Sequence, residues 1–185
     1  MENTPERILI AGAGPVGLIS ALRLSQAGIP VTLFEKEDRL LDDPRAATTH
    51  PATLEMLDEI GIAEEAERQG LVCEEFYFWD RPKGEIVAKF NHKLLADETK
   101  FPYVVQCEQF KLAKITLAKL GEFSDCEVLF SHEVTGVKQD ADSVTLSVTN
   151  SDGPQEFSGK YLFGCDGGRS VIRKSSDIGF EGFTY

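Results

Sequence analysis

The sequence predicts an α/β fold built on a parallel β-sheet, and two observations carry this prediction. Ile8–Ala11 form a short, continuous apolar run, which is typical of a strand buried on both faces of a parallel sheet. A glycine-rich turn, a helical stretch that ends at Gly28 and a second apolar run at Val31–Phe34 follow it. The chain therefore opens with a strand–helix–strand (βαβ) unit.

The rest of the chain predicts further helices and an antiparallel addition to the sheet. Apolar periodicity and terminal glycines predict helices over residues 51–60, 63–69 and 108–120. Runs of β-branched and aromatic residues predict strands over residues 76–79, 85–90, 126–130, 132–139, 144–148 and 161–164. The alternation of Val144, Leu146 and Val148 indicates a half-exposed hairpin or meander. The aromatic density of residues 76–79 favours a sheet packed on one or both faces.

Composition and charge limit the classes of function. The 185 residues, 42% hydrophobic and 27% charged, suit a soluble globular domain. No run approaches the roughly 18 apolar residues of a membrane span, and the start of the chain lacks signal-peptide regions, so we expect a cytoplasmic protein. The net charge of −12 disfavours nucleic acid as a partner. The four cysteines lack metal-ligand or disulfide spacing, so we expect buried, reduced thiols and no metal site.

Residues 12–17 carry the pattern GxGxxG between the first strand and the first helix. In this context the first glycine permits a tight turn, the second allows a pyrophosphate to approach the backbone, and the third lets the helix pack close to the sheet. The helix N-terminus adds N–H groups and partial positive charge, and Pro15 suits its first turn. The pattern predicts a Rossmann-like dinucleotide site.

Glu35 ends the second predicted strand, where an acid can accept hydrogen bonds from a ribose diol and repels a 2′-phosphate. It argues against NADP at this site but does not separate NAD from FAD. The alternative is a glycine turn without a ligand and a solvated surface acid. The residues predicted to bind the cofactor in this part of the chain are Gly12, Gly14, Pro15, Val16, Gly17, Glu35 and Lys36.

A second motif, LFGCDGGRSVIR, occupies residues 162–173. It predicts a strand end, then Asp166-Gly167-Gly168, then a helix with Ser170 as its N-cap. Two adjacent glycines after an acid at a strand end indicate a sharp turn beside something bulky. An ordinary strand-to-helix turn is the alternative. If both motifs bind one cofactor, residues 12–17 and 166–168 must lie close together.

With both motifs, the chain resembles the FAD-dependent aromatic-ring hydroxylases, the flavoprotein monooxygenases typified by para-hydroxybenzoate hydroxylase. The resemblance covers essentially the whole chain and implies one FAD-binding domain over residues 1–185. The implied fold is a Rossmann-like parallel sheet with an antiparallel β meander and the start of a mixed substrate-domain sheet, to which residues 74–106 contribute. The first motif would hold the ADP half of FAD, and Asp166, Gly167 and Ser170 would lie by its pyrophosphate and ribose.

Two single residues extend the resemblance. Arg45 is similar to the family arginine that reaches the cofactor phosphates, and Gln106 resembles a glutamine that contacts the flavin side. Read without the family, Arg45 is a surface arginine and Gln106 is a strand-end side chain that bonds the backbone. The sequence assigns no catalytic residue, because the family's pocket lies partly in a region that follows the second motif.

The implied chemistry is the hydroxylation of a small aromatic, phenolic substrate, with FAD as cofactor and NAD(P)H as co-substrate. Family members continue into a substrate-binding sheet and a third, Gly-Asp motif, so we expect the chain to be the N-terminal portion of such an enzyme. Two other functions stay open. One is another flavoprotein with the same two motifs, such as an isoprenoid reductase or an epoxidase; the other is a non-catalytic fragment.

Overall fold

The structure is a computed structural model that describes residues 6–183 and divides into two compact units. The first unit contains the residues up to Leu41 and from Thr116 onward, and the second contains Asp42–Ile115. Residues 1–5 and 184–185 lie outside the described residues. The first of these ranges is part of the segment predicted to lack signal-peptide character.

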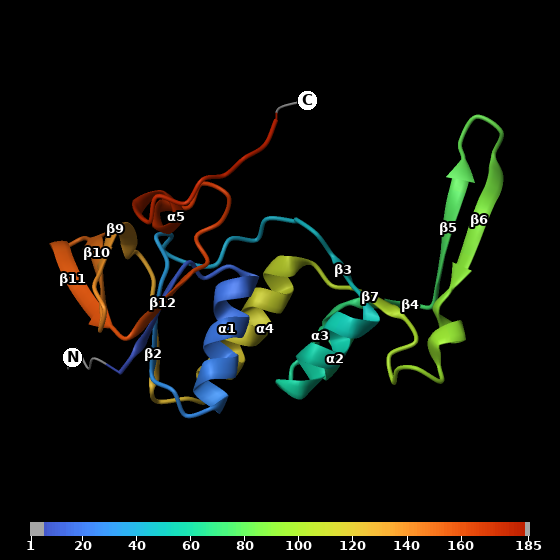
Figure 1. Ribbon diagram of the computed structural model, residues 1–185. Helices are drawn as coiled ribbons and strands as arrows, with labels where there is room; N and C mark the ends of the chain where they lie inside the picture. The colour runs from blue at the N-terminus through green and yellow to red at the C-terminus, as the bar shows by residue number, and fades with distance from the viewer. Residues whose placement is uncertain (1–5, 184–185) are drawn as a thin grey trace. The chain divides into compact units, whose positions relative to one another are not determined.

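A four-stranded parallel sheet forms the centre of the first unit, in the order β12–β1–β2–β8 (Figure 1). Its strands are β1 (Ile8–Ala11), β2 (Val31–Phe34), β8 (Cys126–Leu129) and β12 (Tyr161–Gly164). Every residue of β1 and β2 is buried, which confirms the predicted burial on both faces. Helix α1 (Pro15–Gln26) connects these two strands, so the predicted βαβ opening is confirmed.

An antiparallel meander covers the face of the parallel sheet opposite α1 (Figure 1). It consists of β9 (Glu133–Gln139), β10 (Val144–Asn150) and β11 (Gly153–Gly159), with β10 in the middle. Val144, Leu146 and Val148 are buried while the residues between them are partly exposed, which confirms the predicted alternation. The predicted α/β class, with a parallel sheet and an antiparallel meander, is therefore correct.

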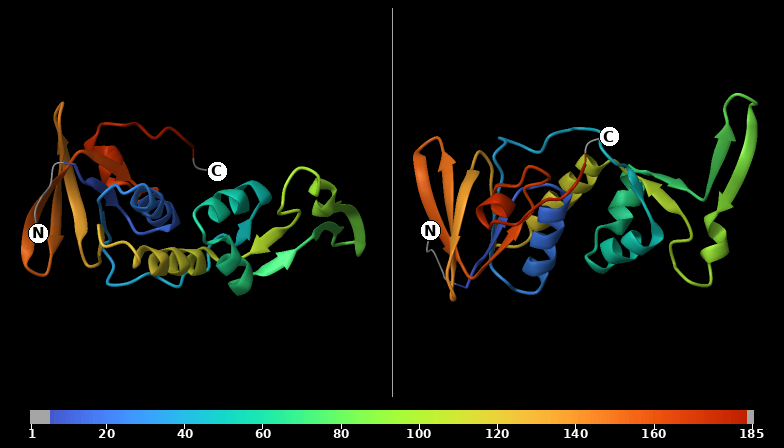
Figure 2. Two further views of the ribbon diagram at one scale, coloured as in Figure 1. Left: turned by 90° about the horizontal axis from the view of Figure 1, so that it is seen from below. Right: turned by 45° about the horizontal axis from the view of Figure 1, so that its top comes forward.

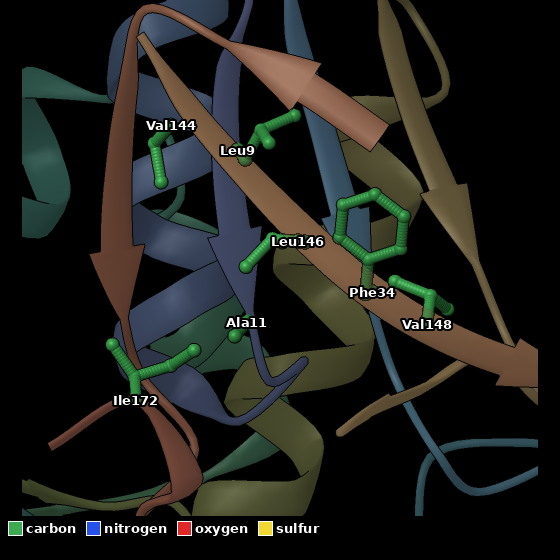
Figure 3. Packing of buried hydrophobic residues seen from close by; sticks show 7 residues of the cluster. All are labelled: Leu9, Ala11, Phe34, Val144, Leu146, Val148 and Ile172. Carbon is green, nitrogen blue, oxygen red and sulfur yellow. The ribbon is translucent and has the colours of Figure 1, made fainter. Parts of the chain in front are cut away.

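The two sheets of the first unit share a hydrophobic core (Figure 3). Because side chains alternate along a strand, Leu9 and Ala11 point to one face of β1, where β10 packs on them. Phe34 contacts Phe157 of the meander edge-on, with ring centroids 4.8 Å apart. The buried members of the cluster are Leu9, Ala11, Phe34, Val144, Leu146, Val148 and Ile172.

Two further helices complete the elements of the first unit. Helix α4 (Gln109–Leu120) begins in the second unit and ends in the first, within one residue of the predicted bounds. The short helix α5 (Val171–Ser175) follows β12, and its Ile172 points into the core (Figure 3).

The second unit combines two helices with a small antiparallel sheet and a separate ribbon (Figure 2). Helices α2 (Pro51–Glu59) and α3 (Ala63–Gln69) agree with the prediction. The sheet has the order β3 (Thr48–Thr49), β7 (Val104–Gln106), β4 (Leu71–Cys73), none of which was predicted. The ribbon pairs β5 (Glu75–Asp80) with β6 (Glu85–Asn91) and leads into a 3₁₀ helix, η1 (His92–Leu95).

The β5–β6 ribbon has an exposed aromatic face, which corrects the prediction of a packed sheet. Phe76 stacks on Phe90 with ring centroids 4.7 Å apart, and Phe78 lies 5.8 Å from each of them. Phe76, Phe78, Trp79 and Phe90 are nevertheless 40 to 58% exposed. The aromatic residues do form strands, but no second layer covers them among residues 6–183.

Glu75 organises polar side chains on this ribbon. Its carboxylate accepts hydrogen bonds from the Tyr77 hydroxyl at 2.5 Å and from the Asn91 amide at 3.0 Å, and it pairs with Lys89 at 3.0 Å. Tyr77 and Lys89 are direct cross-strand neighbours. Glu75 and Tyr77 alternate along β5 with Phe76 and Phe78, and successive side chains of a strand point to opposite faces. The ribbon is therefore amphipathic.

The expectation of four buried thiols is correct for one cysteine. All four are free, but only Cys107 is buried, whereas Cys73, Cys126 and Cys165 are partly exposed. Burial raises the pKa of the Cys107 thiol, because the charged thiolate is less well solvated there.

Candidate functional site

The topology of the first unit brings the two sequence motifs to one edge of the parallel sheet. From β1 the chain passes through α1 to β2 on one side, and β12 pairs on the other side of β1. The carboxyl end of such a central strand is where open α/β sheets bind ligands. Gly12 follows β1 and Cys165 follows β12, and the Cys165 N–H donates a 2.8 Å hydrogen bond to the carbonyl of Ala11.

Gly12 and Gly17 are required by the protein's own packing. Gly12 has a φ of +102°, and a Cβ there would lie 2.5 Å from the carbonyl oxygen of Cys165 and 3.1 Å from the Cα of Asp166. A Cβ on Gly17 would overlap the carbonyl oxygen of Gly12. The turn, the start of α1 and the end of β12 are thus in backbone contact. This confirms that residues 12–17 and 166–168 lie close together.

Gly14 differs from the other two glycines, because a Cβ on it would meet no heavy atom within 4 Å. It is the N-cap of α1, with ordinary extended dihedral angles (φ −68°, ψ 174°). The first amides of a helix have no partner within the helix, and Pro15 has no N–H at all. The amides of Val16 and Gly17 are therefore the donors that this helix end offers to an anion. The open backbone at Gly14 is the cradle that an added side chain would fill.

Glu35 lies beside the glycine turn and is bonded to it. Its Oε2 accepts a 2.8 Å hydrogen bond from the Ala13 N–H, and its Oε1 accepts a 3.1 Å bond from the Glu37 N–H. A carboxylate has about four acceptor positions, so these bonds leave capacity for ligand hydroxyls. The bond to Ala13 was not predicted, because no local sequence rule connects a strand-end acid to a turn more than 20 residues earlier. Lys36 is exposed and pairs with Glu37 at 3.5 Å.

The second motif forms a closed turn and the start of α5. Gly167 has a φ of +79°, and its carbonyl accepts a 3.0 Å hydrogen bond from the Ser170 N–H. Ser170 is the N-cap of α5, as predicted, and its Oγ accepts a 2.9 Å hydrogen bond from the Arg173 N–H. Burial and, to a lesser extent, the charge of Asp166 raise the pKa of the Cys165 thiol, so a neutral thiol occupies the point where the motifs meet.

Arg45 and Gln106, the other two predicted site residues, belong to the second unit. The guanidinium of Arg45 is exposed and lies 3.6 Å from the Asp43 carboxylate. Gln106 ends β7, and its Oε1 accepts a 2.9 Å hydrogen bond from the Thr48 hydroxyl of β3, so its partner is a side chain and not the backbone. Their contacts with a cofactor stay predictions.

The donor set of the first unit fits a dinucleotide. It combines an accessible backbone at Gly14, amide donors at a helix N-terminus and an acid at the end of the adjacent strand, the groups that bind a pyrophosphate and a ribose diol. Within residues 6–183, no group of three or more His, Cys, Asp and Glu side chains is arranged to hold a metal ion. No helix in this same range is long and apolar enough to cross a bilayer.

Comparison with known proteins gives a consistent result for the whole chain. Residues 6–185 match the protein family described as FAD binding domain. Among curated proteins, the chain is 30% identical over 183 residues to para-nitrophenol 4-monooxygenase of Pseudomonas sp. strain WBC-3, covering 99% of this chain and 45% of the relative. It is 33% identical to the 3-(3-hydroxy-phenyl)propionate/3-hydroxycinnamic acid hydroxylase of Shigella sonnei strain Ss046, covering 98% and 32%.

Solved structures show the same similarity. The crystal structure of p-nitrophenol 4-monooxygenase PnpA from Pseudomonas putida DLL-E4 matches with a TM-score of 0.93 and 30% identity, over 97% of this chain and 46% of that one. A ternary complex of aklavinone-11 hydroxylase with FAD and aklavinone matches with a TM-score of 0.85 and 27% identity, over 98% and 36%. The chain therefore spans less than half the length of these relatives.

Proposed function

Because this chain belongs to the family of FAD binding domains, we propose that it is the FAD-binding portion of a monooxygenase that hydroxylates a small phenolic substrate. The single observation that carries the proposal is the juxtaposition of the two motifs. The glycine turn after β1 and the Asp-Gly turn after β12 meet in backbone contact at the carboxyl edge of the sheet. FAD, when bound, supplies the redox chemistry that activates dioxygen.

The residues of the first unit would bind and orient the ADP half of FAD. The amides of Val16 and Gly17 donate to the pyrophosphate, which approaches the backbone at Gly14. Pro15 fixes the first turn of α1, and Glu35 accepts hydrogen bonds from the ribose hydroxyls. Lys36, Gly167 and Ser170 lie around the same end of the sheet as further parts of the cofactor site.

The second unit would contact the flavin and the substrate. Arg45 contacts the cofactor phosphates, and Gln106 contacts the flavin side. Residues 74–106, which include the ribbon, contribute to a substrate-side sheet. The exposed rings of Phe76, Phe78 and Phe90 support this, since an uncovered aromatic face needs a partner layer.

The similar proteins favour an aromatic substrate over the alternative flavoprotein classes. The relatives described above are named as a para-nitrophenol 4-monooxygenase, a 3-(3-hydroxy-phenyl)propionate/3-hydroxycinnamic acid hydroxylase and an aklavinone-11 hydroxylase. NAD(P)H is proposed as the electron donor. The cytoplasm is proposed as the compartment, because the four cysteines are free and show no disulfide pattern.

The visible absorption spectrum of the purified protein tests this proposal. The protein, incubated with added FAD and passed through gel filtration, is expected to elute with flavin absorption bands. A protein fraction without flavin absorption, at FAD concentrations well above the micromolar range, would contradict the proposal and favour a non-catalytic fragment.

Replacing Glu35 with alanine is expected to weaken FAD binding by about 1–3 kcal/mol, the scale of hydrogen bonds to a charged acceptor. The variant loses both the ribose acceptor and the bond to the Ala13 amide. Titration of flavin fluorescence measures the change. Glu37→Ala is the matched control, because it removes a neighbouring carboxylate whose side chain is 41% exposed and pairs with Lys36. Equal affinity in Glu35→Ala and Glu37→Ala would show that Glu35 does not contact FAD.

A further inference from the structure

His132 lies in the short connection between β8 and β9, and both nitrogens of its ring have polar neighbours. Its Nδ1 lies 2.7 Å from the carbonyl oxygen of Phe130. Its Nε2 lies 3.0 Å from the side-chain amide nitrogen of Asn150, the last residue of β10. The imidazole therefore joins the β8–β9 connection to the end of the central strand of the meander.

The backbone groups at the two ends of this series of hydrogen bonds determine which ring nitrogen carries the hydrogen. The Phe130 carbonyl can only accept, so Nδ1 of His132 must be the donor. The Oδ1 of Asn150 accepts a 2.9 Å hydrogen bond from the N–H of Asp152, which can only donate. The side-chain amide of Asn150 therefore presents its NH₂ group to His132, and Nε2 must accept. Only the neutral tautomer with its hydrogen on Nδ1 satisfies both contacts.

The bond from Nδ1 closes a turn that binds the main chain at Glu35. The bond spans Ser131, whose φ of +56° lies in the left-handed region that residues with a side chain rarely adopt. The Ser131 N–H donates a 2.8 Å hydrogen bond to the carbonyl of Glu37. The His132 N–H donates another of 2.8 Å to the carbonyl of Glu35. The turn of residues 130–132 thus holds the segment that carries the predicted ribose acceptor.

An aromatic contact supports the same arrangement. The ring of Phe157 on β11 lies edge-on to the His132 ring, with centroids 6.5 Å apart, and edge-on to the ring of Phe34 at 4.8 Å. Phe34 is the last residue of β2 and directly precedes Glu35. The imidazole is partly buried, so water competes less for its hydrogen bonds. His132 is therefore connected to the end of β2 by packing as well as by hydrogen bonds.

We propose that His132, as the neutral Nδ1–H tautomer, is a positioning residue that holds the main chain at Glu35 where the Glu35 carboxylate can accept hydrogen bonds from the ribose of FAD. This inference rests on the proposed function. The same carboxylate accepts the 2.8 Å hydrogen bond from the Ala13 N–H, so contacts run without a break from Asn150 to the glycine turn. Because both nitrogens of the imidazole are already bonded, the ring has no polar group left for the cofactor and acts through Glu35.

Nitrogen NMR of the imidazole tests the tautomer, in the absence of FAD and at slightly alkaline pH, where an ordinary histidine is neutral. We expect Nδ1 to carry the hydrogen and Nε2 to carry none. The chain contains three histidines, and the signals that disappear in His132→Asn identify those of His132. A hydrogen on Nε2, on both nitrogens, or exchanging rapidly between them would overturn the proposal.

The variant His132→Ala tests the effect on Glu35. Amide hydrogen exchange of Ala13, measured without FAD, reports on the position of the Glu35 carboxylate, and fluorescence titration gives the FAD dissociation constant. We expect the exchange rate and the dissociation constant each to rise by about threefold to tenfold, the factor for loss of one hydrogen bond. His132→Asn should bring both values back to within about twofold of the unmodified chain, because its amide can donate to the Phe130 carbonyl in place of Nδ1. Gln139→Ala, which shortens an exposed neutral side chain at the other end of β9, is the matched control.

Combining His132→Ala with Glu35→Ala separates an action through Glu35 from a general loss of structure. If His132 acts through Glu35, its removal should not weaken FAD binding further once the carboxylate is gone. Full additivity of the two losses would overturn the proposal, and so would faster exchange of Ala13 with unchanged FAD affinity in His132→Ala.

If His132→Ala does not fold, His132→Gln replaces it. The glutamine amide lies near the position of Nε2, so it keeps a partner in Asn150, loses the bond to Phe130 and should give the same two increases. Absence of FAD binding by the unmodified chain would instead contradict the proposed function. The NMR and exchange data would then still decide whether His132 holds the main chain at Glu35.

Discussion

Gly17→Ala is expected to destabilise the protein by about 3 kcal/mol, although alanine is the better helix former by about 1 kcal/mol. The added Cβ would overlap the carbonyl oxygen of Gly12, which is backbone and cannot rotate away. The start of α1 would have to move away from β1 and from the adjacent Cys165. Urea unfolding followed by circular dichroism measures the loss.

Gly179→Ala is the control for this substitution. A Cβ at Gly179 meets no heavy atom within 4 Å, so its effect should remain within about 0.5 kcal/mol. A Gly17→Ala protein as stable as the control would show that α1 does not pack on the glycine turn as described.

Phe34→Ala is expected to cost about 3–5 kcal/mol, the usual range for a large buried aromatic side chain. Phe34 is 1% exposed and joins the parallel sheet to the meander through its contact with Phe157. Its removal leaves a cavity between the two sheets of the first unit. Chemical denaturation gives the free energy of unfolding.

Phe163→Ala makes the same chemical change on β12, where the ring is 43% exposed, and should cost much less. If the two variants lost equal stability, the meander would not depend on Phe34 for its attachment to the parallel sheet.

The sequence predicted the elements whose signals are long or chemically specific. The βαβ opening, α4 and β10 were predicted to within one or two residues, because their apolar periodicity extends over several positions. The contact between the two glycine motifs was expected because both motifs were assigned to one cofactor, and in the structure it arises because β12 pairs in parallel with β1. Ser170 was recognised as an N-cap because capping residues have strong local preferences.

Other parts of the fold lack a local signal. Strands β3, β4 and β7 have only two or three residues each, too few to show alternation, and exist because they pair with one another. Strand β11 contains Gly153, Pro154 and a single large apolar residue, Phe157, so turn signals dominate its sequence. It is a strand because it pairs along its whole length with β10.

In the candidate site too, some features followed from the sequence and others depend on the three-dimensional fold. The glycine spacing predicted a tight turn at Gly12, an accessible backbone at Gly14 and close helix packing at Gly17, and the space around each glycine agrees with this. The hydrogen bonds of Glu35 to Ala13 and of Asp166 to Val171 and Ile172 depend on how the chain turns in space. The aromatic residues of β5 indicated a strand. Whether their rings are exposed depends on what packs on the ribbon, which the local sequence does not show.

The affinity of Gly14→Thr for FAD tests the central claim most directly. Threonine is a competent N-cap residue, and a Cβ at this position meets no heavy atom within 4 Å, so the melting temperature should stay close to that of the unmodified chain. Its side chain would fill the space through which a pyrophosphate approaches the backbone. We therefore expect the FAD dissociation constant to rise at least about tenfold, equal to about 1.4 kcal/mol. An unchanged dissociation constant in a folded Gly14→Thr protein would show that FAD does not bind at the glycine turn.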